Sequence, residues 1–152
     1  MSTNIKLYKK LFSEKKFNEI IEKIEELEKD KSAQVLHILG ICKVLNNGKD
    51  KNIKLSARED FRKAFLKEKN TNLGIEALSN FINLSTDLLK TKDSLKYFDE
   101  VKKDFGDNLQ LLKAISRVYQ FNVRAKDRNK ILEDIVRLSP TSINDWCSYI
   151  YI

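Results

Sequence analysis

The chain has 152 residues, and its 29 Lys or Arg against 22 Asp or Glu give a formal net charge of +7. This length is typical of one domain, and four Gly and one Pro are too few for the many turns of a β-rich fold. Charges occur throughout the first 16 residues and no run of about 18 uncharged residues is present, which argues against a signal peptide and a membrane span. We therefore expect an all-α, cytoplasmic protein.

The first two predicted helices begin near residues 4 and 17, in the stretch "LYKKLFSEKKFNEIIEKIEEL". Apolar residues recur there every three or four positions, as on one face of an α-helix. The residues of this stripe are Leu7, Tyr8, Leu11, Phe17, Ile20, Ile24 and Leu27.

The next two helices carry small residues at defined places. In "LHILGICKVL" a glycine, Gly40, follows two leucines, and in "SAREDFRKAFLKE" a large residue, Phe61, stands between two alanines. A small residue on one helix lets the second helix cross closely, with its large residue at the crossing. The pattern residues are Leu36, Leu39 and Gly40 on the first helix and Ala57, Phe61 and Ala64 on the second.

Between these two helices lies the insertion "NNGKDKNIK". Asn47 and Gly48 are typical helix terminators, and Ser56 with Glu59 forms a capping box. We therefore expect a helix from about residue 32 to this loop and another from about residue 56.

Two further pairs follow, with helices beginning near residues 72 and 92 and near residues 108 and 127. Their apolar and small residues keep the same order, with Arg128 and Ile135 as misfits at two positions where small residues are expected. A ninth helix is predicted near residue 142, because Trp146 follows Leu112 by 34 residues. The pattern residues of the two pairs are Ile75, Leu78, Ser79, Ile82, Ser94, Phe98, Val101, Leu112, Ile115, Ser116, Tyr119, Leu132 and Pro140.

This serial order of small and large residues resembles the tetratricopeptide repeat (TPR), with loop insertions. The resemblance implies a right-handed solenoid of antiparallel helix pairs, with about four and a half units and nine helices. The single domain would span residues 1–152, with units at about 1–31, 32–70, 71–107, 108–141 and a half-unit at 142–152. A compact bundle of eight or nine helices is the alternative.

The sequence offers no set of residues for catalysis. His37 is the only histidine, Cys42 and Cys147 are far apart without a CxxC, and no glycine-rich phosphate loop is present. We expect His37 and both cysteines to be structural residues. The prediction is a non-enzymatic protein without a cofactor or a metal.

The resemblance implies a groove, lined by the first helix of each repeat, that binds a segment of a protein or peptide partner. The carboxylate-gripping subset of the family needs Lys or Arg followed four residues later by Asn, whereas this chain has Ile5 and Lys9. A less specialised groove would use Lys43, Asn80, Lys113 and Arg117.

A basic edge is a second candidate surface, because the turns within the pairs are rich in lysine. Cations near helix C-termini also complement the helix dipole, which is the simpler explanation. The edge residues are Lys15, Lys16, Lys49, Lys51, Lys54, Lys90, Lys92, Arg124, Lys126, Arg128 and Lys130.

The last predicted helix has no partner helix, so the apolar residues Trp146, Tyr149, Ile150 and Ile152 would need more chain or a second copy to cover them. Two alternative functions stay open. The chain could be the amino-terminal repeat region of a larger bacterial transferase of the sulfotransferase or glycosyltransferase type. It could also bind a polyanion through the basic edge, with nucleic acid the least favoured partner because only Phe17 and Phe121 lie near that edge for base stacking.

Overall fold

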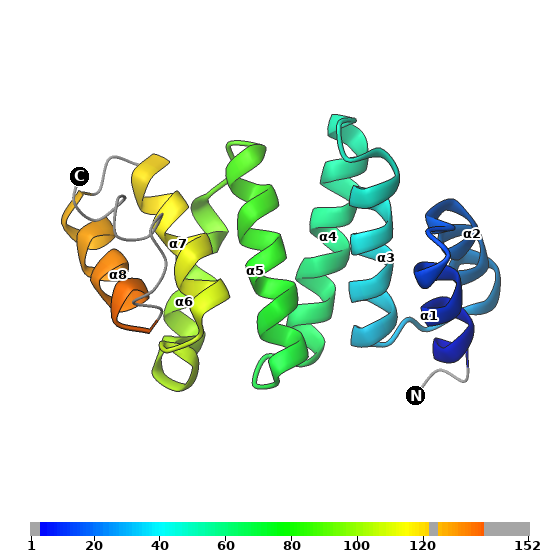
Figure 1. Ribbon diagram of the computed structural model, residues 1–152, viewed down its shortest axis with the longest axis horizontal. Coiled ribbons are helices and arrows are strands. Elements are labelled where there is room, and N and C mark those ends of the chain that lie inside the picture. The colour runs from blue at the N-terminus through cyan, green and yellow to red at the C-terminus, as the bar shows by residue number, and fades with distance from the viewer. Residues whose placement is uncertain (1–3, 122–124, 139–152) are drawn as a thin grey trace. The chain divides into compact units, whose positions relative to one another are not determined.

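The computed structural model describes residues 4–121 and 125–138, and these residues form eight α-helices and no strand (Figure 1). The predicted all-α class is confirmed. The ninth helix predicted near residue 142 lies outside the described residues. Within the described ranges, no helix is long and apolar enough to cross a membrane. The helices are α1 (Ile5–Ser13), α2 (Phe17–Leu27), α3 (Ala33–Asn47), α4 (Lys51–Lys67), α5 (Asn72–Asp87), α6 (Lys92–Phe105), α7 (Leu109–Phe121) and α8 (Ala125–Leu138).

The chain divides into two compact units, Met1–Ala77 and Leu78–Ile152, and the boundary falls within α5. In the first unit each helix packs against the next one along the chain, α1 on α2, α2 on α3 and α3 on α4. A cluster of buried apolar side chains from α1, α2 and α3 forms a core. It consists of Tyr8, Leu11, Ile20, Ile24, Val35, Leu39 and Cys42.

The predicted stripe of the first two helices is only partly buried. Tyr8, Ile20 and Ile24 are fully buried, whereas Leu7 and Leu27 are exposed. Leu27 is the last residue of α2, so no following helical turn covers its side chain. The apolar spacing thus located the helices but overestimated their core.

The α3–α4 crossing has the close approach that the sequence predicted. Gly40 is buried, and a β-carbon at this position would lie 2.7 Å from Cε1 and 2.8 Å from Cζ of Phe61. Ala57, Phe61 and Ala64 are all buried on α4. A side chain at residue 40 would therefore require the Phe61 ring to shift, which favours glycine at this crossing.

The predicted start of the fourth helix was wrong. α3 ends at Asn47, as expected, but α4 begins at Lys51, and its N-cap is Asp50. The Asp50 carboxylate accepts hydrogen bonds from the backbone N–H groups of Asn52 (2.8 Å) and Ile53 (3.2 Å). The last four residues of the insertion therefore extend α4 by one turn, and Ser56 lies inside this helix and is not its cap.

The turn between α1 and α2 is tight and strained. Lys15 N–H bonds to the Phe12 carbonyl and Lys16 N–H to the Leu11 carbonyl, both at 3.0 Å. This pairing is the Schellman motif, in which a left-handed residue ends the helix. That residue is Lys15, with φ 59°, so a side-chain-bearing residue adopts the conformation that favours glycine.

In the second unit, α6 packs on α7 and α7 on α8. The rings of Phe81 and Tyr97 join α5 to α6 edge to face, with centroids 5.6 Å apart. The turn between these two helices repeats the Schellman pattern, with Leu89 N–H on the Thr86 carbonyl and Lys90 N–H on the Ser85 carbonyl. The predicted pattern residues of this unit that the structure describes are buried, except Ser116, which is half-buried.

Candidate functional site

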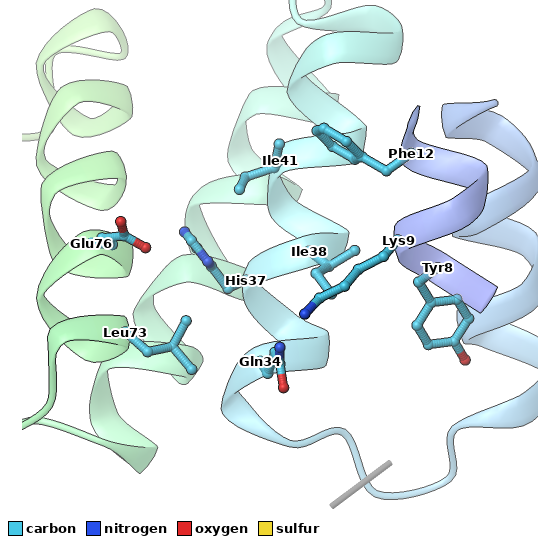
Figure 2. Close-up of a pocket in the computed structure, with 9 residues that line it drawn as sticks. All are labelled: Tyr8, Lys9, Phe12, Gln34, His37, Ile38, Ile41, Leu73 and Glu76. Atoms are coloured by element: carbon cyan, nitrogen blue, oxygen red, sulfur yellow. The ribbon is translucent and has the colours of Figure 1, made fainter. Parts of the chain in front are cut away.

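A cavity of about 330 Å³ opens in the first unit between α1, α3 and the first turns of α5. Figure 2 shows its walls and the side chains that line it. Most of the lining is apolar or aromatic, with one lysine and one glutamate. The lining residues are Tyr8, Lys9 and Phe12 from α1, Gln34, His37, Ile38 and Ile41 from α3, and Leu73 and Glu76 from α5.

The lining residues of α3 all lie on one face of that helix and form one wall of the cavity. The four α3 residues recur at three- and four-residue intervals, so they form one continuous stripe along the helix. A neighbouring stripe of α3 is buried in the core and includes Val35, Leu39 and Cys42. α3 is therefore apolar on two faces, and its second face forms the cavity wall.

Tyr8 presents its ring to the cavity and its hydroxyl elsewhere. The hydroxyl donates a hydrogen bond of 3.0 Å to Oε2 of Glu28, which also accepts one from Nδ2 of Asn4. Figure 2 shows the hydroxyl directed away from the cavity residues of α3. Burial and the bond to Glu28 raise the pKa of Tyr8 to about 12. This side chain therefore serves as an anchored aromatic wall.

His37 is buried between the cavity and α4. Its ring lies edge to face with that of Phe61, with centroids 5.8 Å apart. Burial lowers the pKa of the imidazole, and the nearby Glu76 carboxylate opposes this effect. His37 is therefore neutral at pH 7, as expected for a structural histidine.

The predicted groove residues are not part of this cavity. Lys43 lies on α3 but its ammonium donates to Oδ2 of Asp60 at 2.6 Å and to Oγ of Ser56 at 2.7 Å, both on α4. The two charged side chains are only 15% and 11% exposed. Burial raises the pKa of the Asp60 carboxyl, and the bond from Lys43 opposes this rise. Lys43 is thus held within the α3–α4 pair.

The other three predicted groove residues lie in the second unit. Arg117 on α7 donates to Oδ1 of Asn83 and Oδ1 of Asp87 on α5, both at 2.8 Å. Arg117 therefore links α7 to α5, two helices that are separated by α6 along the chain. Asn80 is half-buried on α5 and Lys113 is exposed on α7.

Part of the predicted basic edge lies in the first unit. The α1–α2 and α3–α4 turns lie at the same end of this unit, with Lys15, Lys16, Lys49 and Lys51 exposed beside Glu14 and Asp50, and Lys54 one turn further along α4 (Figure 1). The opposite end also has four lysines, Lys29, Lys31, Lys67 and Lys69, beside Glu28, Asp30 and Glu68. With these residues the first end carries a charge of +3 and the opposite end +1, so the first end is the more basic of the two, and a polyanion site at this edge stays a prediction.

The remaining predicted residues fall in other parts of the chain. Lys90, Lys92 and Lys130 are exposed in the second unit, and Lys126 and Arg128 belong to α8. Arg124 and the predicted terminal association surface of Trp146, Tyr149, Ile150 and Ile152 lie outside the described residues.

Sequence reasoning did not predict the cavity residues Phe12, Gln34, Ile38, Ile41 and Leu73 as a site. A signal for three of them, Gln34, Ile38 and Ile41, was present, because "AQVLHILGIC" has no Asp, Glu, Lys or Arg over ten residues. A helix that is apolar all round is covered on more than one side.

Comparisons with known protein families, with curated proteins and with solved structures give no match. Over the described part of the chain, no group of His, Cys, Asp or Glu residues is arranged to hold a metal ion.

Proposed function

We propose that this chain is a non-enzymatic helical-repeat module of the tetratricopeptide type, which binds a peptide segment of a partner protein in the α1–α3–α5 cavity. The observation that carries the proposal is the origin of the cavity walls. They come from α1, α3 and α5, the first helices of three successive pairs, and none of the lining residues belongs to α2 or α4.

Three local features support a repeated architecture. Phe61 packs against Gly40 at the small-residue position of the α3–α4 crossing. Arg117 bonds to Asn83, a residue 34 positions earlier, which is the length of one tetratricopeptide unit. The α1–α2 and α5–α6 turns share the same Schellman hydrogen bonds and have a left-handed residue, Lys15 or Leu89, at the same position of the motif.

The chemistry of the cavity favours a peptide over a small substrate. Its volume is at the lower end of the range of about 300 to 1,000 Å³ for small-molecule sites. Four of its nine lining residues, Phe12, Ile38, Ile41 and Leu73, are apolar and can hold an apolar side chain of a partner. Helical modules commonly hold such apolar anchors of a partner segment in a groove between helices.

The proposal can be tested by selecting binding peptides from a random 12-residue phage-display library. A selected peptide is then titrated into ¹⁵N-labelled protein. We expect the largest chemical-shift changes at residues 8–12, 34–41 and 73–76. Changes confined to α2, or to the second unit, would contradict the proposed site.

A further inference from the structure

The cavity carries opposite charges on its two sides. Lys9 lies on α1 and Glu76 on α5, with the apolar side chains of α3 between them. Figure 2 shows the Lys9 side chain reaching from α1 toward α3, and the Glu76 carboxylate directed from α5 toward His37. A segment that crosses the cavity from α1 to α5 would therefore meet first a cation and then an anion.

Lys9 is available to such a segment. It is exposed, and within the described ranges it forms no ion pair and no hydrogen bond. Other lysines of the first unit are engaged, Lys43 with Asp60, Lys16 with Glu14 and Lys31 with Glu25. An ammonium group beside an apolar wall gains most from a partner carboxylate that arrives with an apolar neighbour, because the apolar contact excludes water from the pair.

Glu76 is the matching group on the other side. It is exposed, and the nearby imidazole of His37 is neutral because burial lowers its pKa. The carboxylate charge is therefore not neutralised from that direction. It favours a cationic side chain on the occupant and disfavours an acidic one.

We propose that the cavity binds an amphipathic peptide in one orientation, with a large apolar side chain between α1 and α3, a carboxylate toward Lys9 and a basic side chain toward Glu76. This inference rests on the proposed function, because it specifies the chemistry of the segment and the order of its charges across the cavity. It identifies the partner as a segment with an acidic, an apolar and a basic residue in that order or its reverse along the chain.

The test uses the same random 12-residue library, selected in parallel on three full-length proteins. These are the wild type, Lys9→Glu, and Lys10→Glu as a control with an identical change of charge. Lys10 is exposed on α1 and does not line the cavity. We expect peptides from the wild type and from Lys10→Glu to be enriched in Asp or Glu beside a Leu, Ile or Phe. Peptides from Lys9→Glu should lose the acidic residue and gain Lys or Arg at that place.

A charge exchange gives the quantitative form of the test. For one wild-type-selected peptide, Lys9→Glu should weaken binding by about tenfold, and changing the acidic residue of the peptide to Lys should restore much of it. Apolar peptides that bind in the cavity with no acidic preference, and with equal affinity for Lys9→Glu and Lys10→Glu, would overturn this inference and leave the proposed function intact. Peptides whose binding does not depend on the apolar wall at all would overturn both.

Discussion

The ring of Phe61 fills the space that a β-carbon on residue 40 would occupy, at 2.7 Å from that position. We predict that Gly40→Ala destabilises the protein by about 1 kcal/mol. Alanine would gain about 1 kcal/mol of helix propensity, but overpacking a buried crossing costs about 1 to 3 kcal/mol. Urea denaturation gives the free energy of unfolding.

The control for this prediction is the same change in a Phe61→Leu background. The smaller side chain leaves room for the β-carbon, so there Gly40→Ala should be neutral or stabilising. A Gly40→Ala protein that is more stable than the wild type would show that the close approach carries no constraint.

The buried ion pair of Lys43 and Asp60 leads to a second prediction. Lys43→Met should lower the free energy of unfolding by about 3 kcal/mol, because it leaves a buried carboxylate without its cation. The double variant Lys43→Met/Asp60→Leu should recover much of this loss. Arg62→Met, which breaks the more exposed Arg62–Glu59 pair, should cost less than about 1 kcal/mol. Equal losses for Lys43→Met and Arg62→Met would contradict the assigned role.

His37 makes stability depend on pH. Burial lowers its pKa below the usual 6.5, so the unfolded chain takes up the proton more readily than the folded protein. The stability that the neutral ring contributes is present above pH 6.5 and is lost as the pH falls toward the pKa of the folded state. We expect the free energy of unfolding to fall between pH 7 and pH 5.5, by at most about 1.4 kcal/mol per pH unit.

The assignment to His37 can be checked because it is the only histidine in the chain. His37→Gln should abolish most of the pH dependence in this window. Glu76→Gln should strengthen it, because the carboxylate that favours the protonated ring is removed. A His37→Gln protein with the full wild-type slope would refute the assignment.

The two left-handed turn residues give a fourth prediction. Lys15 and Leu89 have φ of 59° and 60°, and a side chain in this region costs about 1 to 2 kcal/mol. Lys15→Gly and Leu89→Gly should each raise the free energy of unfolding by about 1 kcal/mol. The greater conformational entropy of glycine in the unfolded chain offsets part of this gain. Lys16→Gly is the matched control, since Lys16 has φ −90° and should gain nothing. Equal effects at positions 15 and 16 would argue against strain at Lys15.

Much of the fold could be predicted because helix periodicity is a local property. The helices predicted near residues 17, 72 and 92 begin at Phe17, Asn72 and Lys92. The start of α4 was missed because two signals competed. Asp50 is the N-cap of α4. The Ser56 hydroxyl instead accepts a hydrogen bond from Lys43, which lies 13 residues earlier and so could not be matched to Ser56 from local spacing.

The candidate site was harder to predict for the same reason. Lys43 and Arg117 were expected to face a partner, but Asp60 binds the first, and Asn83 and Asp87 bind the second. Which lysine stays available depends on acidic residues on neighbouring helices. The cavity likewise depends on the space that remains between the apolar faces of three packed helices. Its position therefore follows from tertiary packing and could not be predicted from the spacing of apolar residues in the sequence alone.

The central claim is that the apolar wall of α3 binds a peptide, and the most direct measurement is the affinity of one selected peptide for Ile41→Asp and Leu45→Asp by isothermal titration calorimetry. Ile41 lines the cavity, whereas Leu45, one turn further along α3, is 52% exposed and does not. A carboxylate at position 41 would have to be desolvated by the bound side chain. We predict a loss of at least about tenfold for Ile41→Asp and wild-type affinity for Leu45→Asp. Equal affinities for the two variants would contradict the account.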